Sequence, residues 1–202
     1  MNLISYTKSV IDALLNPADG TRKRMNARDS ILMYYRASII PGILYVILAG
    51  AYGFVEFGSS VGLPVVAPVM AIAAVMMWVA FPVAIVVLSA VYHVFAKLLG
   101  MSGGFGQTLT ATVYSALPAV FVIWLSAIPY LGSILLLVVI AWGAWVFSNA
   151  LANQHGSTRL RAFAAWIIPT AIIGYIALSV LFALAAVLGT AGAAGLGATT
   201  TI

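Results

Sequence analysis

The sequence predicts an all-α membrane protein: a polytopic bundle of five transmembrane helices preceded by an amphipathic interfacial helix. Of the 202 residues, 64% are apolar and 6% are charged, whereas about a quarter of the residues of a soluble domain carry charge. Nine of the thirteen Lys, Arg, Asp and Glu residues precede Ile40. Because a charge at the centre of a bilayer is costly, the long uncharged remainder is expected to lie in hydrocarbon.

Five apolar segments are long enough to cross a membrane, which takes roughly 20 helical residues. The second is overlong, so we expect it to tilt, protrude or bend, with a kink at Pro82, which removes a backbone donor. The alternative is a re-entrant hairpin at Pro82, which would reverse the orientation of everything that follows. The predicted spans are residues 37–56, 64–99, 109–128, 133–152 and 163–188.

Basic residues predict the orientation, because Lys and Arg are retained on the cytoplasmic side. Six precede the first span, Lys97 lies at the end of the second span beside the second connection, and Arg159 and Arg161 lie in the fourth connection, whereas the first and third connections carry none. Five spans make this pattern consistent, with the N-terminus in the cytoplasm and the C-terminus outside. Residues 189–202 are Gly, Ala, Thr, Leu and Ile without charge, and we expect a flexible tail.

The segment 1–35 is expected to lie on the cytoplasmic surface of the membrane. Apolar residues recur at helical spacing up to Leu15, and Asn16 and Pro17 should end that helix, which predicts an amphipathic helix in the headgroup region. Basic side chains near the surface attract anionic lipids, or they act only as a topology signal. The predicted headgroup-binding residues are Arg22, Lys23 and Arg24.

The composition argues against an enzyme. With two histidines, four acidic residues and no cysteine, the chain lacks the ligands for a dedicated metal cage and the acid for a Ser-His-Asp arrangement within a span. We therefore expect no catalytic residues, no metal and no cofactor, and we expect no nucleic acid among the partners.

Polar residues within the spans concentrate in the predicted cytoplasmic half of the membrane. His93 and Lys97 are one helical turn apart, as are Asn149 and Asn153, so each pair shares a helix face. The functional interpretation is a binding surface or polar cavity open to the cytoplasm, and the alternative is interfacial anchoring with interhelical hydrogen bonds. The predicted cluster comprises His93, Lys97, Gln107, Tyr114, Ser115, Asn149, Asn153 and His155.

Three short motifs in sequence carry a family resemblance: YHVFAKLLG at 92–100, GGFGQTL at 103–109 and YSALP at 114–118. With these motifs in this order, the chain resembles the prokaryotic form of the Yip-one domain family, the Ypt/Rab-interacting integral membrane proteins. The resemblance covers nearly the whole chain and implies a five-span fold with a cytoplasmic N-terminus. In eukaryotic relatives it also implies Rab GTPase contacts, vesicle trafficking and membrane shaping.

The resulting hypothesis is a non-enzymatic, Yip-like membrane protein that organises or scaffolds the membrane. Its expected partners are lipids with anionic headgroups, together with a protein partner or a second copy of the chain. The GTPase contact is not carried over, because the segment ahead of the first span has only about 35 residues. The alternative function is a small transporter or channel with the polar cluster as its cytoplasmic entrance.

Overall fold

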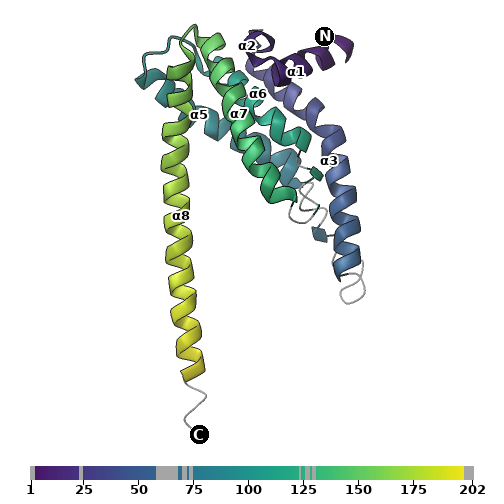
Figure 1. The fold of residues 1–202 in the computed structure, drawn as a ribbon, viewed down its shortest axis with the longest axis vertical. Helices are drawn as coiled ribbons and strands as arrows, with labels where there is room; N and C mark the ends of the chain where they lie inside the picture. Colours follow the sequence, from purple (N-terminus) through teal and green to yellow (C-terminus); the bar gives the residue numbers. More distant parts are fainter. Residues whose placement is uncertain are drawn as a thin grey trace. The chain divides into compact units, whose positions relative to one another are not determined.

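The computed structural model confirms an all-helical protein over the residues that it describes, which are 3–22, 25–57, 75–122 and 131–197 with isolated positions between them (Figure 1). These residues contain helices and turns and no strand. Residues 1–166 and 167–202 form two units, and most of the helices belong to the first. The elements are α1 (Leu3–Leu15), α2 (Pro17–Gly20), α3 (Ala27–Phe57), the π-helical turn η1 (Met76–Ala80), α5 (Phe81–Leu98), α6 (Phe105–Val122), α7 (Leu131–His155) and α8 (Arg159–Gly197).

Four of the described helices are long and apolar enough to cross a membrane. The predicted span at 109–128 corresponds to α6, whose 18 residues are not among the four. Three threonines, a glutamine, a tyrosine and a serine make α6 more polar than its neighbours. Membrane-spanning helices are thus present, and the count of five stays a prediction. The four segments are Ala27–Tyr52, Trp78–Leu98, Ile134–His155 and Arg159–Ala186.

Polar caps start two of these helices earlier than hydrophobicity predicts. The Asn26 side chain accepts a hydrogen bond of 2.8 Å from the backbone N–H of Asp29, which is the bond of an N-cap residue. Helix α3 therefore begins at Ala27, ten residues before the predicted span. At α8, the Thr158 hydroxyl lies 3.4 Å from the N–H of Arg161 in the same relation.

The chain stays helical through Pro82 and does not reverse there. Ala80 and Phe81 have helical dihedral angles, and Pro82 occupies the first turn of α5. The wider π-helical turn η1 comes immediately before it. Because proline has no N–H and its ring crowds the preceding turn, a local change from α- to π-helical spacing is a common accommodation. The predicted start of this span near Pro64 lies outside the described residues.

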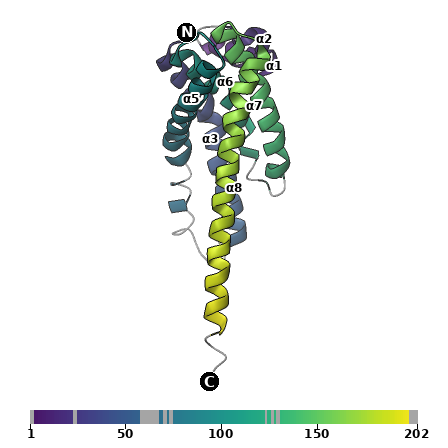
Figure 2. The same ribbon diagram turned by 90° about the vertical axis from the view of Figure 1, so that its left-hand side faces the viewer.

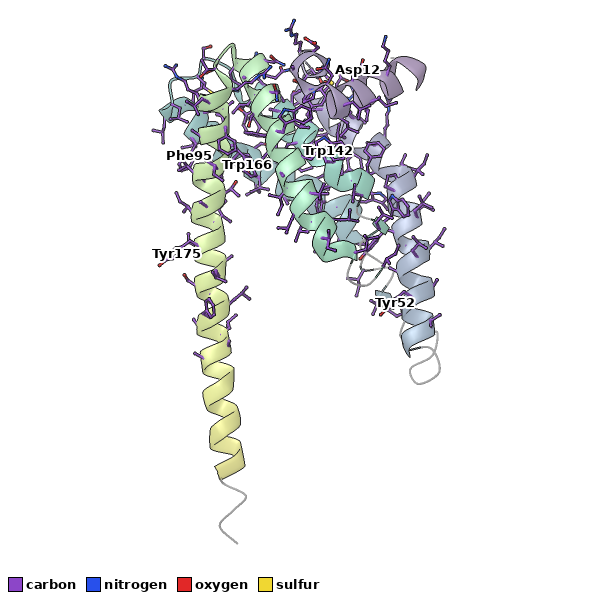
Figure 3. The ribbon with its side chains drawn as sticks, viewed as in Figure 1. Asp12, Tyr52, Phe95, Trp142, Trp166 and Tyr175 are labelled. Atoms are coloured by element: carbon purple, nitrogen blue, oxygen red, sulfur yellow. The ribbon has the colours of Figure 1, made fainter. Side chains whose placement is uncertain are left out.

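Helix α8 runs to Gly197, nine residues past the predicted end of the last span at Leu188. The flexible segment expected from 189, on the basis of small uncharged residues, stays a prediction. However, these include several alanines and no proline, and alanine has the highest helix propensity. Residues 198–202 lie outside the described part of the chain. Side chains from Ala171 to Ala186 are exposed throughout, including Tyr175, which Figure 3 labels on this helix.

The polar helix α6 lies at the centre of the first unit. It packs against α7, α3 and α5 and also contacts α1, and ten of its residues are buried. Close packing is possible at Gly143 of α7, where an added Cβ atom would lie 3.0 Å from the Ser115 carbonyl oxygen of α6. A small residue at this crossing lets two membrane helices approach closely.

One end of this unit collects several polar segments. Helices α1 and α2, the turn between α5 and α6, and the turn between α7 and α8 all lie at this end in both views (Figures 1 and 2). Helix α7 begins at the opposite end, so α6 runs from one end of the unit to the other. This arrangement agrees with a helix that crosses the membrane inside the bundle.

A crossing by α6 places residues before and after it on opposite sides of the membrane. The chain has no cysteine, so single cysteines can be introduced at Gly104 and Ile128, which are both exposed. In sealed vesicles, a membrane-impermeant thiol reagent should label one of these variants and spare the other until detergent is added. Equal labelling of both before detergent would show that α6 does not cross and that the chain has four spans.

Candidate functional site

Helices α5 and α7 end in the same kind of turn, and the two turns meet. Each ends on a glycine with positive φ, 75° at Gly100 and 62° at Gly156, a backbone conformation that glycine adopts without strain. The Ser102 hydroxyl, in the first turn, donates to the carbonyl of His155 at 3.2 Å. In both turns a backbone N–H bonds to a carbonyl five residues earlier, at 3.0 Å for Met101 to Ala96 and for Ser157 to Ala152.

Two histidines are joined through a buried threonine at this junction. The Thr108 hydroxyl lies 2.9 Å from Nδ1 of His93 and 3.0 Å from Nε2 of His155. A hydroxyl has one proton to donate, so it donates to one ring and accepts from the other. The two imidazoles therefore take opposite roles, and the tautomer of one depends on that of the other.

Lys97 and Gln107 hold the loop that connects α5 to α6. The Lys97 ammonium donates to the Ser102 carbonyl at 3.3 Å, and the Gln107 side chain accepts from the N–H of Gly104 at 2.7 Å. Gln107 is the third residue of α6, and a bond from this position back to the N-cap N–H is half of a capping box. Both side chains thus order the loop in front of the histidine pair.

Two other predicted residues, Asn149 and Asn153, lie elsewhere. Asn153 donates to the Ala18 carbonyl and to the Thr21 hydroxyl, both at 2.9 Å. The neighbouring Gln154 donates to the Thr21 carbonyl at 2.8 Å. Asn153 therefore binds the N-terminal segment, whereas the buried Asn149 donates to its own helix at the Trp145 carbonyl, at 2.8 Å.

Tyr114 and Ser115 lie in the buried part of α6. The Ser115 hydroxyl donates to the Thr112 carbonyl of the same helix at 2.8 Å. Tyr114 is fully buried, and its hydroxyl has no hydrogen-bond partner among the described residues.

Four of the eight predicted residues gather at the two turns: His93, Lys97, Gln107 and His155. Two further residues at this place, Ser102 and Thr108, were missed by the prediction.

The N-terminal segment is fixed to α7 at three places. Besides the bonds of Asn153 and Gln154, the indole of Trp142 donates to the Leu14 carbonyl at 3.0 Å, and Figure 3 shows Trp142 beside the N-terminal helices. Thr21 is fully buried. These side chains satisfy carbonyls at the ends of α1 and α2, which have no partners within their own short helices.

Of the predicted headgroup-binding residues, the structure describes Arg22. Its guanidinium lies 3.1 Å from the Asp19 carboxylate, and both side chains are largely exposed. Such an exposed pair contributes little to stability, so the Arg22 side chain stays accessible to a ligand such as a lipid headgroup. Lys23 and Arg24 lie outside the described residues.

Two pockets in the first unit differ in character. A pocket of about 330 Å³ with polar walls lies at the two turns and the start of α8. A second pocket, of about 360 Å³, has apolar walls from α3, α5 and α6, including Tyr34, Phe81 and Val120. Among the described residues, no three His, Asp or Glu side chains group as metal ligands.

Comparison with known families decides the assignment. The family model of the Yip1 domain matches residues 11–197. The chain belongs to the Yip1 domain family. This confirms the resemblance inferred from the motifs around the α5–α6 turn, and the match ends at the last residue of α8. No curated protein and no solved structure matches the chain.

Within this Yip1 domain, Gly103 is a sensitive position. An added Cβ atom would lie 2.5 Å from Cγ of His155 and 2.6 Å from Oε1 of Gln107. We expect Gly103→Ala to displace the buried ring and lower the stability by about 1–3 kcal/mol. The control is Gly106→Ala, where nothing lies within 4 Å and the gain in helix propensity should stabilise α6 slightly. Thermal unfolding in detergent measures both, and equal midpoints would contradict the packing at His155.

The bonds of Asn153 predict how the N-terminal segment is held. Asn153→Leu removes bonds to Ala18 and Thr21, so residues 3–21 should exchange backbone hydrogen at least roughly tenfold faster. Asn149→Leu, which breaks only a bond within α7, is the control. Hydrogen-exchange mass spectrometry on the purified chain distinguishes them. Unchanged exchange in Asn153→Leu would show that the segment is held by other contacts.

Proposed function

We propose that this Yip1-domain protein organises the membrane without catalysis, by presenting its docked N-terminal helix to the headgroup layer. The observation that carries the proposal is the division of the apolar side chains of α1. Val10, Ala13 and Leu14 are buried in the bundle, while Ile11 and Leu15 are 47% and 70% exposed. The helix thus binds the protein with one face and offers a second apolar face to its surroundings.

This division refines the interfacial helix expected from the sequence. An isolated amphipathic helix would place all these residues in lipid, but here α7 holds the end of α1 through Trp142. Because the helix is already folded and docked, it pays no ordering entropy on contact with lipid. Burying an exposed Ile or Leu side chain fully stabilises by about 1.5–3 kcal/mol, so two of them favour insertion.

A helix held at fixed depth in one leaflet spreads the headgroups of that leaflet, which favours curvature. Basic residues supply the attraction to anionic lipid: Lys8 is exposed on α1, and Arg22 is exposed just beyond α2. Lys97 lies in the last turn of α5, and Arg159 and Arg161 lie in the first turn of α8, so all three adjoin the turns at the same end of the unit (Figure 1). This common placement supports the proposed orientation, with the N-terminus in the cytoplasm and the C-terminus outside.

A transporter or channel is the other candidate, and it has less support. It requires the predicted polar residues to surround a continuous hydrated path. Instead, Asn153 binds the N-terminal segment, and Asn149 and Ser115 bond within their own helices. Rab contacts are not part of the proposal. Anionic lipid is the proposed partner, and a protein partner or self-association would use the exposed helix surfaces.

The cysteine-free chain allows a direct test of where α1 lies. A spin label on Leu15→Cys should collide with dissolved oxygen, which concentrates in lipid, whereas a label on Asp19→Cys should collide with a water-soluble nickel complex. Electron paramagnetic resonance of the full chain in anionic vesicles measures both. The same nickel accessibility at the two positions would place α1 in water and overturn the interfacial position.

A functional readout follows from the same helix. Replacing Ile11 and Leu15 by Asn should reduce the ability of the reconstituted chain to shrink or tubulate vesicles, with unchanged flux of ions and small solutes. Vesicle diameter by light scattering and electron microscopy gives the first quantity, and entrapped dyes give the second. Solute flux that His93→Ala abolishes would favour the transporter over the membrane-organising protein.

A further inference from the structure

A polar pocket is formed where the α5–α6 turn, the α7–α8 turn and the first turn of α8 meet. Its volume is about 330 Å³, and its walls include Ser102, His155, Ser157, Thr158 and Arg161. All of them belong to the first unit. The pocket is separate from the N-terminal segment, which contacts α7 through Trp142, Asn153 and Gln154.

Two buried polar atoms in residues of the pocket wall have no partner among the described residues. One is Nδ1 of His155, whose side chain is 3% exposed, and the other is the Ser157 hydroxyl. A buried polar atom without a hydrogen bond costs free energy. Both residues contribute to the wall of the same pocket, so a single polar ligand there could satisfy both atoms.

The charges around the pocket favour an anion. Arg161 is exposed on its wall, and the Lys97 ammonium bonds to the carbonyl of Ser102, which also belongs to the wall. The sequence contains no acidic residue after Glu56, so no carboxylate in these turns competes for the cations.

The start of α8 adds the positive end of a helix dipole. The first N–H groups of a helix have no intrahelical partner, and the helix dipole makes this end favourable for negative charge. Thr158 accepts from two of them, those of Arg161 and Ala162. The N–H groups of Arg159 and Leu160 precede these two, and neither residue belongs to the pocket wall.

We propose that this pocket binds a phosphate monoester group. Arg161 supplies a planar guanidinium suited to two phosphate oxygens, and the Ser157 hydroxyl donates to another. In one arrangement the Thr108 hydroxyl accepts from Nδ1–H of His93 and donates to Nε2 of His155. The proton of His155 is then on Nδ1, which can donate to the anion. The bound anion thus selects one of the two tautomer arrangements that the histidine pair allows.

A phosphate monoester could reach the pocket as a lipid headgroup or as a soluble compound. The purified full chain in uncharged detergent is titrated with inorganic phosphate and, separately, with short-chain phosphatidic acid at constant ionic strength. The midpoint of thermal unfolding should rise and saturate with the ligand, because a ligand of the folded state stabilises it. Protection by both probes identifies a site for free phosphate compounds, and protection by phosphatidic acid alone identifies a headgroup site.

Two arginines on the same helical turn provide matched variants. Arg161→Gln should weaken the apparent affinity by roughly tenfold or more, as expected for the loss of a charge-assisted contact. Arg159→Gln removes the same charge from a residue outside the pocket wall and should change affinity less than about threefold. Arg161→Lys, which keeps the charge, should lie between them, and Ser157→Ala should weaken binding without changing the charge.

No saturable shift with either probe, or equal losses in the two glutamine variants, would overturn the phosphate site. The exposure of Arg161 makes its variants compatible with folding, and unfolding midpoints without ligand check this. The proposal goes beyond membrane organisation and does not rest on it. Failure of the phosphate titration leaves the spin-label result at Leu15 unaffected, and the converse also holds.

Discussion

The buried side chains of α6 have no contact with solvent, so most of its polar groups bond to partners inside the bundle. Thr112 and Ser115 donate to carbonyls of their own helix, at 2.9 and 2.8 Å. Thr110 is shared between helices, because its hydroxyl lies 2.8 Å from that of Ser30 on α3, and Thr108 joins α5 to α7. A helix with this composition is stable at the centre of the bundle and not at its lipid-facing edge, and the other helices of the first unit pack around it.

This constraint explains which parts of the fold the sequence could predict. Long apolar runs predict α3, α5, α7 and α8, because lipid demands them regardless of what each helix contacts. Their ends depend on local hydrogen bonds, so Asn26 and Thr158 start helices ahead of the apolar runs. Helix α6 is the hardest to classify from the sequence. Its polar side chains lower its hydropathy, and the same side chains favour a position at the centre of the bundle, where they find partners.

The predicted polar cluster separates for a related reason. Spacing along a helix shows which residues share a face, but not which neighbour that face meets. His93 and Lys97 do meet the same turn region. Asn149 and Asn153 share a face of α7, yet one bonds within its helix and the other reaches the N-terminal segment. The signal for that contact was the polar run at 153–155, whose successive side chains point about 100° apart around the helix and so meet different partners.

The last turn of α7 therefore connects two features that are far apart in sequence. Asn153 and Gln154 hold the segment that ends at Thr21, while His155 forms part of the pocket at the α7–α8 turn. The Schellman-type turn at Gly156 fixes this end of the helix. The backbone hydrogen bonds of this turn hold its residues together, so they move as one body. Any displacement of His155 toward or away from Thr108 would therefore also act on the three bonds that join Asn153 and Gln154 to Ala18 and Thr21.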